Sequence, residues 1–202
     1  DPVRGITNHS SGKMGFAIAR AAQEAGAQVT LVAGPVHLAT PRGVNRIDVV
    51  SAREMHEVTV ESAQAAHVFI ATAAVADWRP AVEAEHKIKK DGSGAVPELA
   101  FVENPDILSE VAHGQRAQAG ELYCVGFAAE SQDLVANAQA KRARKGVPLL
   151  VGNLGPATFG RDDNALVLVD DEGVTELPHA SKRRLAQQLV AEIARRVSGA
   201  SA

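Results

Sequence analysis

Residues 8–13 bring together groups that could bind an anion. They stand just before a predicted helix and include Asn8, Ser10, Ser11, Gly12 and Lys13. Backbone N–H groups and the positive end of the helix dipole attract phosphate at such a place, and hydroxyl and ammonium groups add further donors. The residues alone leave two interpretations open: a phosphate site, or a turn that only caps the helix.

This turn does not match the common nucleotide-binding loops. It lacks the Gly-x-x-x-x-Gly-Lys-Ser/Thr spacing of P-loop proteins and the Gly-x-Gly-x-x-Gly spacing of dinucleotide-binding domains. The next predicted strand, residues 28–32, continues into Ala33, Gly34 and Pro35. A dinucleotide-binding domain needs an acidic residue there to hold the ribose, so ordinary NAD binding is disfavoured.

Three basic clusters could also hold anions, at residues 87–90, 141–145 and 182–184. Because the net charge is −3, the chain lacks the basic excess of a general nucleic-acid-binding protein, and we expect no nucleic acid as a partner. Each cluster can instead be a solvated surface. Lys141 and Lys145 are four residues apart in a predicted helix, so they share one face.

The elements that position these groups alternate along the chain. Short β-branched runs are followed by helical patterns, which is typical of βαβ units on a mostly parallel sheet. Helices are predicted over residues 15–25, 51–65, 104–112, 131–145 and 181–197, and strands over residues 28–32, 47–50, 68–74, 122–127, 148–151, 165–169 and 175–177. The last two strands form a late hairpin. Residues 79–98 are rich in Pro, Gly, Lys and Glu and predict a long loop, which in a compact domain is usually functional or mobile.

The length of 202 residues predicts a single domain. The longest apolar runs are far shorter than the roughly 20 residues of a membrane-spanning helix. No charged-then-apolar leader opens the chain, so we expect a cytoplasmic protein without membrane contact. The single cysteine, Cys124, excludes an internal disulfide and is expected to be a core residue. The seven histidines show no metal-binding spacing.

The whole chain resembles a known family, the synthetase half of the bacterial bifunctional phosphopantothenoylcysteine decarboxylase/synthetase. The segments that carry the resemblance are DPVR (1–4), ITNHSSGKMG (6–15), VAGP (32–35), AAVAD (73–77), KIKK (87–90), NPDI (104–107), VGFAAE (125–130), KRARK (141–145) and the Asp-Asn-Ala of 163–165. The resemblance implies an α/β fold, a Rossmann-like three-layer sandwich with a mostly parallel central sheet and a late antiparallel extension. It also implies a homodimer whose extra strands, within residues 79–102, cross to the partner, and a full protein fused to a flavin-dependent decarboxylase domain.

The same resemblance implies a ligase reaction in two steps. The carboxylate of 4'-phosphopantothenate attacks the α-phosphate of CTP and pyrophosphate leaves; the amine of cysteine then displaces CMP from the acyl-cytidylate. A carboxylate approaches a triphosphate only if cations and oriented donors offset their repulsion, which gives the basic clusters a purpose in an acidic protein. A triphosphate substrate also makes Mg2+ the expected metal.

The resemblance assigns a role to particular residues. Asn8 is expected to donate its amide to the acyl carbonyl, and Lys87 to neutralise the acyl phosphate or CTP; both are catalytic in this interpretation. The residues expected to hold the nucleotide and its phosphates are Ser10, Ser11, Gly12, Lys13, Ala71, Thr72, Ala73, Asp77, Lys87, Pro105, Asp106, Ile107, Leu108, Phe127, Lys141 and Lys145. Asp77 is also the expected Mg2+ ligand.

Structural alternatives accompany these roles. Asn8 can be a turn or cap residue and Asp77 a helix cap, while Phe127 either stacks on cytosine at the end of its strand or belongs to the core. Two rival functions also stay open: an NAD(P)-dependent reductase, suggested by the βαβ pattern alone, and an inactive nucleotide-binding dimerisation module.

The sequence departs from the family in two places. The family has a further strand and a Gly-Pro-Thr-type loop before the Asp-Pro-Val-Arg segment, so residues 1–202 are expected to form a single ligase domain without its first strand, as in a fragment of a longer chain. The second departure is Leu154, where the family usually has Asp after Asn153.

Overall fold

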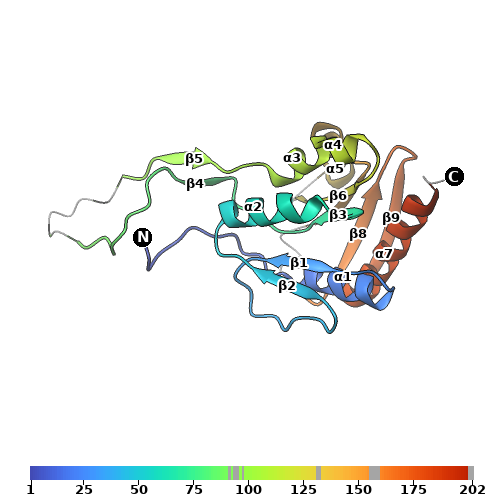
Figure 1. Ribbon diagram of the computed structural model, residues 1–202, viewed down its shortest axis with the longest axis horizontal. Helices are drawn as coiled ribbons and strands as arrows, with labels where there is room; N and C mark the ends of the chain where they lie inside the picture. The colour runs from blue at the N-terminus through green and yellow to red at the C-terminus, as the bar shows by residue number, and fades with distance from the viewer. Residues whose placement is uncertain (91, 93–95, 97, 131–132, 155–159, 200–202) are drawn as a thin grey trace.

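The computed structural model describes residues 1–202 except 91, 93–95, 97, 131–132, 155–159 and 200–202 (Figure 1). The helices are α1 (Lys13–Glu24), α2 (Ala52–Ala63), α3 (Ile107–His113), α4 (Gln115–Gln118), α5 (Leu134–Lys145) and α7 (Lys182–Gly199). The strands are β1 (Thr30–Ala33), β2 (Asn45–Asp48), β3 (Val68–Ala71), β4 (Trp78–Pro80), β5 (Phe101–Glu103), β6 (Tyr123–Glu130), β7 (Leu149–Leu154), β8 (Asp163–Val169) and β9 (Val174–Ser181).

A five-stranded sheet with the order β3-β6-β7-β8-β9 forms the centre of the molecule. β3, β6 and β7 are mutually parallel, whereas β8 and β9 add two antiparallel pairings. The predicted α/β class and the late hairpin are therefore confirmed, but the sheet is mixed rather than mostly parallel. The reason is local, because a tight turn between β8 and β9 can join only antiparallel strands.

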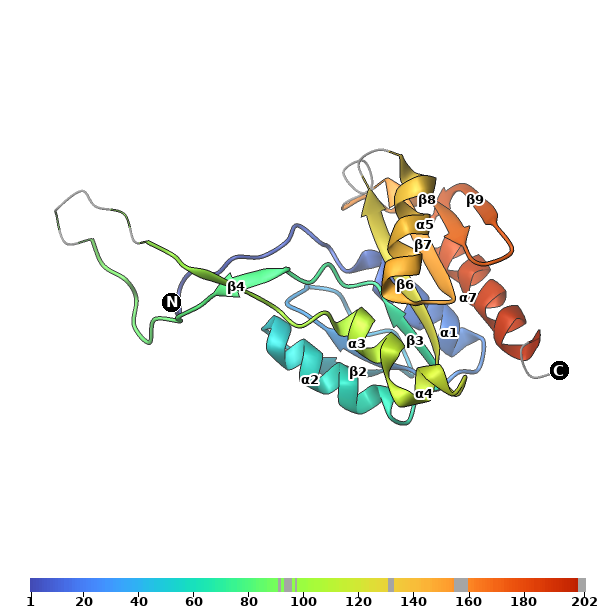
Figure 2. The same ribbon diagram turned by 90° about the horizontal axis from the view of Figure 1, so that it is seen from above.

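Helices cover both faces of this sheet (Figures 1 and 2). On one face, α1 and α7 pack on a core that includes Val125, Leu149 and Val151. On the other face, α2, α3 and α5 pack on a second core that includes Cys124 and Leu150. Successive residues of a strand point to opposite faces, so β6 and β7 supply side chains to both cores. The central residues of both strands, Cys124 and Val125 on β6 and Leu149 to Val151 on β7, are buried, which is why they form apolar runs in the sequence.

β1 and β2 form a separate parallel pair, in register from Thr30 with Asn45 to Ala33 with Asp48. Within the described part of the chain, β1 pairs only with β2 and β3 only with β6, so each has one edge without a strand partner. The expectation that a first strand is missing is untested by this arrangement and stays a prediction.

The start of α2 confirms the predicted capping box. The Ser51 hydroxyl accepts a hydrogen bond from the Glu54 amide at 3.2 Å, and the Glu54 carboxylate accepts one from the Val50 amide at 2.8 Å. The bond from Val50 is the main cause that lowers the pKa of Glu54. The helix therefore begins where the sequence predicts.

Residues 78–103, here called the arm, project away from the rest of the molecule in both views (Figures 1 and 2). Its base is a short antiparallel ribbon in which Trp78 pairs with Glu103 and Pro80 with Phe101. The extra strands implied by the family resemblance are thus present, where the local pattern alone predicted only a loop. Several large apolar side chains of the arm are exposed: Trp78, Val82, Val96, Leu99 and Phe101.

Cys124 lies in the core, as predicted. Burial raises the pKa of its thiol to about 11, so the thiolate that reacts with electrophiles is scarce at neutral pH. In the residues that the structure describes, no helix is long and apolar enough to cross a membrane.

Candidate functional site

Three segments meet where α1 begins. A Cβ atom on Gly15 would lie 2.7 Å from Oγ1 of Thr72, the residue that follows β3. Gly12 adopts a left-handed φ of 72°, and a Cβ there would lie 3.2 Å from Val36, just beyond β1. The two glycines therefore let the start of α1 and the turn before it approach the carboxyl ends of β1 and β3. This is the edge where open α/β sheets bind ligands.

Asn8 is held at this edge. Its Nδ2 donates a hydrogen bond to the Ala74 carbonyl at 3.0 Å, and the residue is exposed. The structure thus brings Asn8 beside the segment of Ala71, Thr72 and Ala73, residues that the family resemblance assigns to the same site. An amide nitrogen has two hydrogens, so this bond orients the group and leaves a second donor.

Lys13 has a different environment from the one predicted. Its ammonium donates to the Gly160 carbonyl and to Oδ1 of Asp162, both at 2.7 Å. The hydrogen bond from Lys13 is also the main cause that lowers the pKa of Asp162. The predicted phosphate-binding ammonium therefore already has a carboxylate partner 149 residues away in sequence.

Lys182 ties the same segment to the start of α7. It is buried and donates from Nζ to the Arg161 carbonyl at 2.5 Å. Burial, and then repulsion from Lys13, lower the pKa of its ammonium. Sequence reasoning gave Asp162 no role at this edge, and it named Lys182 only as a member of the basic cluster at residues 182–184 that could hold an anion.

Asp77 lies just before the arm, with its side chain exposed. A strand, β4, follows it, so the alternative of a helix cap is wrong. Its carbonyl accepts from the Asn104 amide at 2.8 Å, and the Asn104 side chain donates to the Ala76 carbonyl at 2.9 Å and accepts from Arg79 at 3.1 Å. These bonds fix the base of the arm around Asp77.

No group of three or more His, Cys, Asp or Glu side chains that could hold a metal ion is found among the described residues. Asp77 alone does not make a protein cage for a cation. It fits a Mg2+ that is held chiefly by substrate phosphates, which is the usual arrangement for that ion.

The helix predicted from Asn104 begins three residues later. Asp106 is the cap of α3, because its carboxylate accepts from the Ser109 amide at 3.0 Å, while the Asn104 side chain is engaged at the arm. Ile107 and Leu108 are buried in the core, so only their backbone can face a ligand. Pro105 lies between Asn104 and Asp106, outside the helix.

Lys145 pairs with Asp106 across the gap between α5 and α3. Partial burial raises the pKa of the Asp106 carboxyl, but hydrogen bonds from Lys145 and the Ser109 amide outweigh this and hold its pKa below the ordinary value. Lys141 lies one turn earlier on α5, so the prediction that the two lysines share a helix face is confirmed. Through its ion pair with Asp106, Lys145 lies at the start of α3 rather than at residues 8–13.

Phe127 does not end its strand, because β6 continues to Glu130. Additional pairs with β7, up to Glu130 with Leu154, extend the strand beyond the apolar run that the sequence displays. Phe127 is half-buried and packs against the core on the α1 and α7 face, as the alternative interpretation predicts. Its stacking on cytosine stays a prediction.

Lys87 is the predicted site residue that lies farthest along the arm, between β4 and β5. It is exposed. The arm that carries Lys87 projects from the sheet in both views (Figures 1 and 2).

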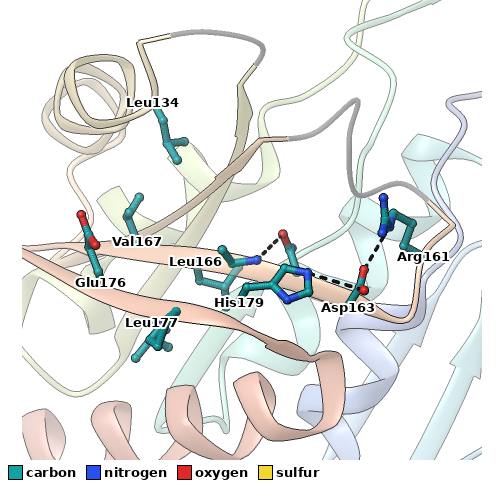
Figure 3. A pocket seen from close by; sticks show the side chains of 11 residues that line it. Leu134, Arg161, Asp163, Leu166, Val167, Glu176, Leu177 and His179 are labelled. Carbon is teal, nitrogen blue, oxygen red and sulfur yellow. Dashed lines mark hydrogen bonds and ion pairs between the residues drawn. The ribbon is translucent and has the colours of Figure 1, made fainter.

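The pocket in Figure 3 has a volume of about 330 Å3 and lies between α5 and the hairpin of β8 and β9. Leu134, Val167 and Leu177 supply apolar walls. At one side, Asp163 binds Arg161 at 3.0 Å and His179 at 3.5 Å. None of the predicted site residues lines the described part of this pocket, so it is distinct from the edge where they gather.

Comparison with known proteins identifies the class. Residues 1–197 match the family described as the C-terminal domain of DNA/pantothenate metabolism flavoproteins, and the chain belongs to that family. The chain is 49% identical over 193 residues to the coenzyme A biosynthesis bifunctional protein CoaBC of Vibrio cholerae, covering 94% of this chain and 48% of that protein. It is 46% identical over 200 residues to CoaBC of Escherichia coli, with 97% and 48% covered. The chain thus spans about half the length of these curated relatives.

Solved structures agree with the fold. The crystal structure of the C-terminal domain of a CoaBC protein is 32% identical and superposes with a TM-score of 0.80, covering 98% of this chain and 89% of that one. A Cab2 variant in complex with phosphopantothenate-cysteine has the same fold, with a TM-score of 0.77 at 17% identity over 98% of this chain and 81% of that one.

Proposed function

We propose that this chain is the phosphopantothenate–cysteine ligase part of a bifunctional coenzyme A biosynthesis protein. One observation carries the proposal: residues 8–15, which carry part of the family resemblance, lie against Thr72 and Ala74 just beyond the parallel strand β3. The CoaBC relatives and the ligand of the Cab2 variant support the substrate class. The product is 4'-phosphopantothenoylcysteine, formed from 4'-phosphopantothenate, cysteine and CTP through an acyl-cytidylate, with release of CMP and pyrophosphate.

In this mechanism the edge of the sheet holds the reacting acyl group. The free N–H of Asn8 donates to the acyl oxygen, where negative charge develops as the amine of cysteine adds to the carbonyl carbon. A donor that is already oriented needs no reorganisation at that moment, and it stabilises the transition state more than the ground state. The bond from Asn8 to the Ala74 carbonyl supplies this orientation.

Cations then allow a carboxylate to approach the triphosphate. Lys87 neutralises the acyl phosphate, and Lys141 and Lys145 attract the phosphates. Asp77 would hold a Mg2+ ion, which would supply further positive charge to the phosphates. Ser10, Ser11 and the N–H groups at the start of α1 complete the cradle. Binding of nucleotide at Lys13 or Lys145 exchanges an existing carboxylate partner for a phosphate, which keeps these ammonium groups paired in both states.

A second copy of the chain is part of the proposal. The arm exposes Trp78, Leu99 and Phe101 to solvent and holds Lys87 away from its own sheet edge. Exposed apolar side chains gathered on one projecting segment are typical of a surface that a partner covers. A homodimer in which each arm crosses to the partner covers these side chains and carries Lys87 to a sheet edge.

The remaining half of the CoaBC relatives supports a fusion to a flavin-dependent decarboxylase domain. In the longer chain, the segment between the fused domain and residue 1 would supply the predicted first strand of the ligase domain. In that case the unpaired edges of β1 and β3 gain a partner and the two sheets become one Rossmann-like sheet.

The test is release of pyrophosphate from CTP in the presence of cysteine, with and without 4'-phosphopantothenate. We expect release only when the acid is present, together with formation of the amide. ATP in place of CTP tests nucleotide choice, and CTP is expected to be the better substrate. Pyrophosphate release that does not require 4'-phosphopantothenate would reject the proposed ligase activity. A thermal shift with NADP but not with CTP would favour a reductase.

A further inference from the structure

The Asp1 carboxylate is buried although it lies at the start of the chain. Its side chain is only 2% exposed. Oδ1 accepts hydrogen bonds from the amides of Val3 and Arg4, each at 3.0 Å. Oδ2 accepts from the Arg4 guanidinium, at 3.0 Å from Nε and 2.5 Å from Nη2, and from the Ile88 amide at 3.3 Å. Hydrogen bonds from this many donors fix the carboxylate in place.

Arg4 completes the contact with the arm. Its Nη2 also donates to the Ile88 carbonyl at 2.8 Å, 84 residues away in sequence. Asp1 and Arg4 therefore hold both the N–H and the C=O of Ile88, so the two peptide groups that flank this residue are fixed. We call these three residues the arm clamp.

The arm clamp acts on the residue next to Lys87. The Ile88 N–H belongs to the peptide group that joins Lys87 to Ile88, and Lys87 itself is exposed with a long, flexible side chain. Fixing that peptide restricts where the ammonium can reach. Most side chains in this segment of the arm are exposed, and the bonds at Ile88 tie its backbone to a distant part of the chain.

We propose that Asp1 and Arg4 are positioning residues for Lys87, which set where its ammonium meets the reacting acyl phosphate. This inference rests on the catalytic role proposed for Lys87. The clamp lies on the chain that carries Lys87, so it serves the reaction in the same way when the arm reaches the site of a second copy. Positioning of a cation affects the reacting step more than the binding of substrate.

The test compares Asp1→Asn with Glu85→Gln in the full-length protein. Both changes remove one negative charge near Lys87, but Glu85 is exposed and lies outside the clamp. We expect kcat for amide formation to fall about 10- to 100-fold in Asp1→Asn with KM for 4'-phosphopantothenate nearly unchanged, and no change in Glu85→Gln. Hydrogen exchange at the Ile88 amide should accelerate only in Asp1→Asn.

A double-mutant cycle separates positioning from a general effect on the fold. In a Lys87→Gln background, Asp1→Asn is expected to cause no further loss, because the group that it positions is gone. An equal loss in both backgrounds, or an unchanged kcat in Asp1→Asn, would overturn the inference. Full activity of Lys87→Gln alone would instead remove Lys87 from the proposed mechanism, and the clamp would then have nothing to position.

Arg4→Lys gives a second, milder variant. Lysine keeps the positive charge but cannot bond Asp1 and the Ile88 carbonyl with one planar group. We expect a smaller fall in kcat than in Asp1→Asn, again absent in the Lys87→Gln background. A higher KM for 4'-phosphopantothenate with an unchanged kcat would contradict a positioning role.

Discussion

The carboxyl edge of the sheet and the arm are built in opposite ways. At the edge, Gly12 and Gly15 pack so closely against neighbouring segments that a Cβ atom meets another residue. On the arm, large apolar side chains are exposed and the clamp at Ile88 supplies the distant contact. The comparison teaches that this fold holds Asn8 at a closely packed edge, whereas Lys87 lies on an exposed segment that a second copy would cover in the proposed dimer.

The largest expected effect tests the rigid side of this comparison. In Asn8→Asp, a carboxylate replaces the amide and no longer donates to the acyl oxygen. We expect amide formation to fall about 100- to 1000-fold while the acyl-cytidylate accumulates, which quenched-flow chromatography measures. Asn45→Asp on β2 makes the same change at an exposed position and should leave the rate intact. Normal amide formation in Asn8→Asp would remove Asn8 from the mechanism.

The arm is tested by its exposed tryptophan. Trp78→Ala removes a large apolar group that is 58% exposed in the single chain. If the arm docks on a second copy, we expect the dimer Kd to rise by about 30-fold, corresponding to roughly 2 kcal/mol for an interface tryptophan. Analytical ultracentrifugation measures this. Val50→Ala, also exposed but outside the arm, is the control, and an unchanged dimer in Trp78→Ala would place the interface elsewhere.

A smaller effect is expected from filling the close approach at the edge. Gly15→Ala puts a Cβ 2.7 Å from Thr72 Oγ1. The hydroxyl can rotate, so we expect a loss of only about 1 kcal/mol in the free energy of unfolding, measured by urea denaturation. Adding Thr72→Ala to Gly15→Ala should restore much of the lost free energy of unfolding. Gly5→Ala, where a Cβ meets nothing within 4 Å, should not destabilise.

The smallest effect concerns the charges at the α3 and α5 end of the edge. Because the pKa of Asp106 is lowered in the folded state, its pairing stabilises the fold above the unfolded pKa of about 3.9 and is lost as pH falls through the lowered value. Asp106→Asn keeps the helix cap but loses the charge. We expect it to be less stable than the parent at pH 7, by less than about 1 kcal/mol for this half-exposed pair.

Urea denaturation at several pH values measures this difference between Asp106→Asn and the parent. The difference should shrink towards zero as pH falls below the lowered pKa of Asp106, because the parent then loses the same charge. Asp48→Asn on β2, which removes a charge from an exposed position, serves as the comparison. A difference that persists unchanged at low pH would assign the loss to packing rather than to the ion pair.

Much of the local structure was predictable because its causes are local. The Ser51 capping box and the buried strands of the central sheet each depend on residues a few positions apart. Errors arose where a distant partner decided the outcome. Asn104 was expected to cap α3 but bonds to the arm, and β6 runs past Phe127 because β7 continues beside it.

The candidate site divides in the same way. The place of residues 71–73 at the end of a buried strand was predictable from the apolar run before them. The hydrogen bond from Asn8 to the Ala74 carbonyl was not, because it joins residues 66 positions apart. The pairing of Lys13 with Asp162 was missed, as was that of Lys145 with Asp106. Each ion pair joins residues far apart in sequence, and no pattern within one segment indicates which carboxylate an ammonium will meet.

The sequence by itself therefore determined the α/β class, the starts of individual helices, the family and the residue types that its chemistry needs. The tertiary structure decided which groups are available at the edge, that Lys87 lies on a projecting arm, and that Asp1 and Arg4 hold its neighbour. The physical reason is the distance along the sequence over which each interaction acts. Caps and periodicity act within a few residues, whereas ion pairs and close backbone approaches depend on how the chain brings distant segments together.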